Sequence, residues 1–161
     1  MVSWEEAEEN ICKTKNFLKS NLLLSPYRQV DPIKCNDCIF RYLAILIVSG
    51  RIRVNKISNK NNSLWLSQKI ESDCANKKMH GAKWHDSTIS VINNYFVSKG
   101  YVSEKEPNLY FGKADLAILD LPIYIEVGTI NIYKLLINLV NMKNCTIIVV
   151  PSDDSVLEFL L

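Results

Sequence analysis

The sequence lacks the features that define several large classes of protein. Its longest apolar run, CIFRYLAILIVSG, is interrupted by Arg41 and is too short to span a bilayer. The first residues, MVSWEEAEEN, are acidic and contain no apolar stretch of the signal-peptide type. The sequence has no glycine-rich phosphate loop, no Ser-His-Asp or Cys-His catalytic spacing and no internal repeat. We therefore expect an intracellular, cytoplasmic protein with no membrane partner.

An excess of charge of one sign is also absent. The chain has 19 Lys and Arg residues against 17 Asp and Glu, which gives a net charge of +2. A balance this mild does not indicate a nucleic-acid partner, so only local clusters of basic residues can support one. Hydrophobic residues make up 48% of the 161 residues, which is enough for a packed core and excludes a disordered chain.

The cysteine count is five, an odd number, and an intracellular protein keeps most of its thiols reduced. Cys35 and Cys38 form a CxxC motif, the usual first half of a zinc site or a redox pair. No second CxxC follows, so further zinc ligands would have to come from Cys74, His80 or His85. Packing of the two cysteines in a partly buried helix, a disulfide and a zinc site all remain open.

Helical patterns dominate the first third of the chain. Residues 4–19 have acids in the first turns and lysines later, which matches the helix dipole. A break with two prolines at 25–32 precedes a second helix at 34–50, which ends at Gly50. Residues then alternate over 51–68 around the polar turn SNKNN, a pattern typical of a β-hairpin.

A helix, a glycine and a basic hairpin with a polar tip resemble the winged helix-turn-helix DNA-binding domains over residues 4–68. The resemblance implies that the hairpin contacts DNA phosphates. The basic residues concerned are Arg51, Arg53, Lys56 and Lys60. The alternative is that these side chains form an ordinary solvated face. Residues 69–83 are polar without a clear period, and we interpret them as a linker.

The second half of the chain predicts the order helix, three strands, helix, strand, helix. Its first helix, at 84–100, carries a stripe made of Trp84, Thr88, Val91, Ile92, Tyr95 and Phe96. Three strands are expected next, at 101–106, 113–120 and 123–128. A helix at 131–143 follows, then a fourth, buried strand at 145–150 and a short last helix at 151–161.

Two acids stand near the ends of the expected hairpin ADLAILDLPIYIEVGT. A turn centred between Asp120 and Leu121 pairs positions whose numbers sum to 241, so Asp115 lies opposite Glu126. Such a pair has Cβ atoms about 4.5–5.5 Å apart, and two anions at that distance repel. The surrounding strands are apolar, which adds a desolvation cost. A divalent cation removes both costs, and carboxylate oxygens suit Mg²⁺ or Mn²⁺. The alternative is that this end frays and both acids face water.

Residues 84–150 resemble the core of the PD-(D/E)XK nuclease superfamily. The shared order is a helix, three strands with an Asp on the second and a Glu on the third, another helix and a fourth strand. GKADLAIL is similar to the family's acid-bearing second strand, and IYIEVGT to its third. The resemblance implies a nuclease in which Asp115 and Glu126 bind the catalytic metal ion. The family's lysine normally follows the Glu by two positions, where this chain has Gly128.

Lys134, on the following helix, is the substitute that the resemblance suggests. Helical side chains lean toward the N-terminus of their helix, so its ammonium could reach back toward Glu126. The alternative is a solvated lysine on a polar face that it shares with Asn131, Asn138 and Asn141. A first-helix residue often joins such metal sites, and the candidates are His85 and, more weakly, Asp86; either could be an ordinary helix-start residue.

These observations predict an α/β (α+β) protein. A winged-helix-like domain at 1–68 is followed by a linker at 69–83 and by a nuclease-like domain at 84–161 with a restriction endonuclease-like αβββαβ core. The leading hypothesis is a metal-dependent DNA endonuclease with DNA as its partner. The alternatives are a DNA-binding regulator that kept the nuclease fold without catalysis, and a subunit of a larger assembly or homodimer that docks through a C-terminal helix, VLEFLL.

Overall fold

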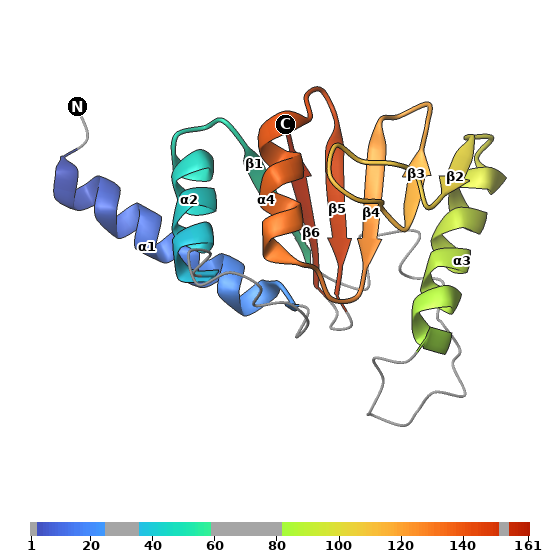
Figure 1. The fold of residues 1–161 in the computed structure, drawn as a ribbon, viewed down its shortest axis with the longest axis horizontal. Helices are drawn as coiled ribbons and strands as arrows, with labels where there is room; N and C mark the ends of the chain where they lie inside the picture. The colour runs from blue at the N-terminus through green and yellow to red at the C-terminus, as the bar shows by residue number, and fades with distance from the viewer. Residues whose placement is uncertain (1–2, 25–35, 59–81, 152–154) are drawn as a thin grey trace.

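The computed structural model describes residues 3–24, 36–58, 82–151 and 155–161 (Figure 1). Within these residues the chain is a mixed α/β structure with four helices and one six-stranded sheet. The helices are α1 (Trp4–Asn21), α2 (Asn36–Val48), α3 (Ala82–Ser98) and α4 (Ile132–Asn141). The strands are β1 (Arg53–Ser58), β2 (Ser103–Lys105), β3 (Leu116–Ile118), β4 (Ile123–Val127), β5 (Thr146–Val150) and β6 (Ser155–Leu160).

The sheet has the strand order β1-β6-β5-β4-β3-β2. β4 and β5 are parallel and are connected through α4, since parallel neighbours need a crossover. The other neighbouring pairs are antiparallel. The expected order of a helix, three strands, a helix and a fourth strand is therefore confirmed between α3 and β5.

Apolar side chains on the two faces of the sheet form separate cores. Successive residues of a strand point to opposite faces, and on β5 Val149 belongs to one core and Ile148 to the other. Leu18 of α1, Leu43 of α2 and Leu135 of α4 pack on the first face. Ile92 and Phe96 of α3 pack on the second face. Figure 1 shows α2 and α4 near β1 and β6, and α3 near β2. The stripe expected on α3 is thus confirmed for Trp84, Thr88, Ile92, Tyr95 and Phe96, whereas Val91 is only partly buried and outside this core.

β1 belongs to the same sheet as the strands of the second half. It pairs with β6 over six residues, from Arg53 opposite Leu160 to Ser58 opposite Ser155. The second strand of the expected basic hairpin, and the proposed linker up to residue 81, lie outside the described residues. The winged-helix-like domain therefore stays a prediction.

The expected C-terminal helix is wrong, because residues 155–160 form the strand β6. β6 lies between β5 and β1, and its apolar side chains fill both cores: Val156 packs on the α3 side, and Leu157 and Phe159 pack on the other side. An apolar run that is buried on both faces is typical of a central strand. These side chains are used within the chain, so the docking role proposed for a VLEFLL helix loses its basis.

Candidate functional site

The site lies where β3 begins and β4 ends. The predicted pairing is confirmed: Leu116 stands opposite Ile125 and Ala117 opposite Tyr124, so the numbers sum to 241. Just beyond this ladder the Asp115 N–H donates to the carbonyl of Ile125 at 3.1 Å. The Asp115 Oδ2 accepts a hydrogen bond from the Val127 N–H at 2.7 Å. Asp115 is thus bonded to the residues on both sides of Glu126, and its charge acts on Glu126. The direct pair of Asp115 with Glu126 expected from the spacing is one position beyond the ladder, which ends at Leu116 and Ile125.

Glu126 is a buried carboxylate with a basic partner. Its exposed fraction is 8%, and Lys134 Nζ lies 2.6 Å from its Oε1. The contact is an ion pair, and its angles leave Oε1 buried without a well-formed hydrogen bond. Burial, and to a lesser degree the nearby charge of Asp115, raise the pKa of Glu126 to about 6 against the lowering effect of Lys134. At neutral pH the carboxylate is ionised, yet it sits in a poorly solvated position.

His85 brings α3 to the site. Its Nε2 lies 3.3 Å from Asp115 Oδ1, and its Nδ1 lies 3.4 Å from Asp86 Oδ1. The Asp86 side chain is 78% exposed, so it faces solvent on the outer side of the ring. Of the two first-helix candidates, His85 reaches Asp115, whereas the Asp86 side chain pairs with His85.

A hollow of about 310 Å³ opens beside Asp115 and His85. Its other lining residues are Asp86, Ile89, Ser90, Lys105 and Glu106. The hollow gives solvent, or a small charged group such as a phosphate, access to the Asp115 side of the site.

Lys134 is held in place by a loop that the sequence did not connect with it. Its Nζ donates to the carbonyl of Lys113, and its side chain passes Gly112, whose missing Cβ would lie 3.5 Å from Lys134 Cε. One turn further along α4, Asn138 holds the same loop. Its Oδ1 accepts from the Phe111 N–H at 2.8 Å and its Nδ2 donates to the Phe111 carbonyl at 3.0 Å.

The expectation that Asn138 lies on a solvated face with Lys134 is therefore wrong. The exposed fraction of Asn138 is 1%, because the loop between β2 and β3 covers this side of α4. Asn131 instead caps the helix, since its Oδ1 accepts from the N–H groups of Tyr133 and Lys134. Asn141 is exposed as expected. No local signal in the sequence separates Asn138 from Asn141, since Phe111, the residue that Asn138 binds, is 27 residues away in the chain.

Gly128 occupies the position where the nuclease family has its lysine. Its φ is +90°, a left-handed conformation that side-chain-bearing residues rarely adopt. Its N–H donates to the Val150 carbonyl at 2.7 Å, and an added Cβ would meet the Trp84 ring at 3.6 Å. A lysine at this position would be strained, and the ammonium group beside Glu126 comes from α4.

The described residues contain no group of three or more His, Cys, Asp or Glu side chains arranged to hold a metal ion. Asp115, Glu126 and His85 therefore do not close into a three-ligand cage. A Mg²⁺ ion commonly uses only one or two carboxylates, with waters and substrate phosphates completing its shell. The two acids are compatible with that kind of site, and His85 then orients Asp115.

The basic residues expected to bind DNA are spread along β1. Glu126 is paired with Val149 of β5, Val149 with Leu157 of β6, and Leu157 with Lys56 of β1. Lys56 is exposed. Paired residues share a face of the sheet, so Lys56 is on the same face and level as Glu126, three strand spacings or about 14 Å away. Arg53 lies opposite Leu160, further from the site. Lys60 is outside the described residues.

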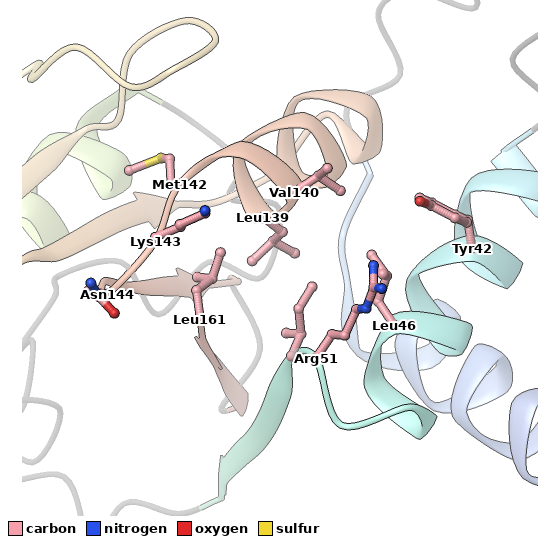
Figure 2. Close-up of a pocket in the computed structure, with 10 residues that line it drawn as sticks. Tyr42, Leu46, Arg51, Leu139, Val140, Met142, Lys143, Asn144 and Leu161 are labelled. Atoms are coloured by element: carbon pink, nitrogen blue, oxygen red, sulfur yellow. The ribbon is translucent and has the colours of Figure 1, made fainter.

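Arg51 lies at another place. It lines a cavity of about 350 Å³ between α2, α4 and the end of β6, together with Tyr42, Leu139 and Lys143 (Figure 2). The three basic residues that the structure describes therefore do not form one patch with the acids. Only Lys56, of the described three, shares the level of Glu126.

Of the CxxC motif, only Cys38 lies within the described residues. Cys38 is exposed on α2, so the expectation that it packs in a partly buried helix is wrong. Cys35, Cys74 and His80 lie outside the described residues, so the disulfide and zinc interpretations stay predictions. His85, the remaining candidate zinc ligand, contacts Asp115.

Among the helices that the structure describes, none has the length and apolar character needed to cross a membrane. Comparison of the chain with protein-family models, with curated proteins and with solved structures gives no match in any of the three.

Proposed function

We propose that this protein is a metal-dependent DNA endonuclease that acts inside the cell. The observation that carries the proposal is the meeting of Glu126, Lys134, Asp115 and His85, which come from β4, α4, the start of β3 and α3. Two acids can hold a divalent cation, and a lysine beside them can bind a phosphate oxygen, which is the chemistry that metal-assisted phosphodiester hydrolysis uses. The order α3, β2, β3, β4, α4, β5 supports the proposal, since it follows the order expected of the PD-(D/E)XK superfamily.

The donor set fits a hard divalent cation. The buried Glu126 Oε1 lacks a well-formed hydrogen bond, and Asp115 offers its Oδ1 toward the hollow-lining imidazole. In the proposal these two carboxylates hold Mg²⁺ or Mn²⁺. Such an ion, when bound, lowers the pKa of a water molecule and neutralises the scissile phosphate.

The chain's own residues supply the remaining roles. The Lys134 ammonium is held by the Lys113 carbonyl and by Glu126, so it is fixed in position to bind a phosphate oxygen or to orient water. The Val127 N–H and His85 hold the two oxygens of Asp115. The raised pKa of Glu126 makes its carboxylate a ready acceptor for a positive charge. Lys56 contacts the DNA backbone in this proposal.

A second candidate function is DNA binding without catalysis. Two observations favour it: Gly128 replaces the usual lysine, and each acid already has a basic neighbour, Lys134 for Glu126 and His85 for Asp115. These ion pairs could replace the metal ion and keep the fold for recognition alone.

Cleavage of plasmid and branched DNA with Mg²⁺, Mn²⁺ or EDTA separates the two candidates. The variants are Asp115→Asn and Glu126→Gln, with Glu104→Gln as a matched control, because Glu104 is an exposed acid on β2. Metal-dependent cleavage that both site variants lose and the control keeps supports the nuclease. No cleavage by any form, with salt-sensitive DNA binding intact, supports the second candidate and overturns the first.

A further inference from the structure

The segment between β2 and β3 continues their pairing as a long hairpin. Within the strands, Ser103 stands opposite Ile118 and Lys105 opposite Leu116, so the numbers sum to 221. The same sum holds for the Glu106 N–H bonded to the Asp115 carbonyl and for the Leu109 N–H bonded to the Gly112 carbonyl. Tyr110 and Phe111 are therefore the two-residue tip of this hairpin, and Asp115 lies on its second arm.

The hairpin tip is fixed in place on α4. The buried Asn138 makes two hydrogen bonds with the backbone of Phe111. The Phe111 ring also packs edge-to-face on Tyr133, with ring centroids 5.9 Å apart. Figure 1 shows the hairpin reaching from β2 and β3 across the sheet toward α4. The tip is thus pre-organised, which lowers the entropy cost of binding a ligand.

The tip presents aromatic surface to solvent. The exposed fraction is 67% for Tyr110 and 48% for Phe111. Adjacent large apolar side chains exposed on a fixed loop are typical of a binding surface. Two cations accompany this surface. Lys113 is in the same hairpin, and Lys134 of α4 donates to the Lys113 carbonyl. Aromatic faces beside positive charge are the arrangement that binds unpaired nucleic-acid bases and their phosphates.

We propose that Tyr110 and Phe111 stack on unpaired bases, so that the substrate carries a single-stranded segment beside the bond to be cleaved. The inference rests on the proposed nuclease function and specifies its substrate class. Asp115 lies four residues along the strand from Phe111 at the tip, or about 13 Å. That length corresponds to about four nucleotides of a stacked strand. The bases of an intact duplex have their faces covered and cannot bind in this way.

The test measures binding without cleavage. In EDTA, a fluorescently labelled 12-nucleotide oligo(dT) and a duplex of equal length are titrated with the full chain, and binding is followed by anisotropy. Tyr110→Ala should weaken oligo(dT) binding roughly 5- to 150-fold, the loss of one stacked base, and leave duplex binding unchanged. Tyr110→Phe should bind like the unaltered protein. Tyr42→Ala, an exposed tyrosine on α2, is the matched control and should have no effect.

An equal effect of Tyr110→Ala on oligo(dT) and duplex, or no effect on either, overturns the stacking proposal. A change only in self-association, seen by sedimentation, also overturns it and assigns the tip to a protein contact. The nuclease proposal is judged separately through Glu126→Gln, which should lose cleavage and keep the preference for oligo(dT). If no form cleaves DNA but Tyr110→Ala still weakens only oligo(dT) binding, the nuclease proposal is rejected and the stacking proposal is supported.

Discussion

Lys134 Nζ lies 2.6 Å from Glu126 Oε1, so a helix that follows β4 returns a positive charge to the end of that strand. The turn between them contains Gly128, whose left-handed backbone lets the chain reverse toward α4. The ion pair offsets part of the cost of burying Glu126, although the pKa of Glu126 still stands at about 6. The charge balance of the site therefore depends on this lysine.

Replacing Lys134 by methionine keeps an unbranched side chain of nearly the same length and removes its charge. Because the ammonium lowers the pKa of Glu126, the variant should raise that pKa above about 6. Carboxyl carbon chemical shifts followed by NMR from pH 4 to 9 measure the change. Lys113→Met is the control, since Lys113 Nζ pairs with Glu106 at 3.5 Å and not with Glu126. A pKa that stays at about 6 would contradict the prediction.

The raised pKa of Glu126 also sets a pH dependence of stability. The folded state binds this proton more tightly than the unfolded state, whose ordinary value is 4.5. Protonation of Glu126 therefore adds about 2 kcal/mol to the free energy of unfolding below pH 4.5. This contribution is lost as the pH rises through about 6. Urea unfolding at pH 4.5 and pH 7 should show this loss in the unaltered protein and not in Glu126→Gln. Equal pH dependence of the two proteins would refute the assignment.

Asn138→Ala should destabilise the fold by about 2–3 kcal/mol, because it leaves the backbone groups of Phe111 without their buried partner. Asn141→Ala is a control of the same residue type on the same helix. Asn141 is exposed and makes a bond to the Ile137 carbonyl, so its loss should cost less than about 0.5 kcal/mol. Urea unfolding compares the two, and similar losses would show that Asn138 does not anchor the hairpin.

Lys56→Gln and Arg51→Gln should affect DNA binding differently. Lys56 is level with Glu126, whereas Arg51 lines the cavity near α2. If Lys56 contacts one phosphate, its variant should weaken binding and reduce the slope of log K against log salt by about 1. Arg51→Gln should leave the slope unchanged. Binding at several salt concentrations measures both, and identical slopes for the two variants would remove Lys56 from the interface.

The sequence allowed some parts of the site to be predicted because they depend on local spacing. A short turn fixes which residues of two strands face each other, so the pairing of β3 with β4 followed from the position of the turn. The reach of Lys134 toward Glu126 followed from the lean of helical side chains. The contact of His85 with Asp115 was one of two open choices, because position on a helix alone did not separate it from Asp86.

Other parts depend on distant segments and could not be read locally. The run VLEFLL has no period that separates a strand from a buried helix, and its neighbours β5 and β1 decided its state. Asn138 is a polar residue on a face of α4 that the β2–β3 hairpin covers in the folded chain. In both cases the deciding contact comes from residues far away in the chain.

The position of β6 between β5 and β1 has a consequence for the order of folding. Asn55 of β1 and Glu158 of β6 are bonded at 3.0 Å, yet they stand 103 residues apart in the chain. A ribosome adds about 5–20 residues each second, so β1 waits roughly 5 to 20 seconds for its partner. During that time the edge of β1 that later pairs with β6 lacks this partner and is open to other strands. We expect the newly made first half to be a substrate for chaperones until the last strand arrives.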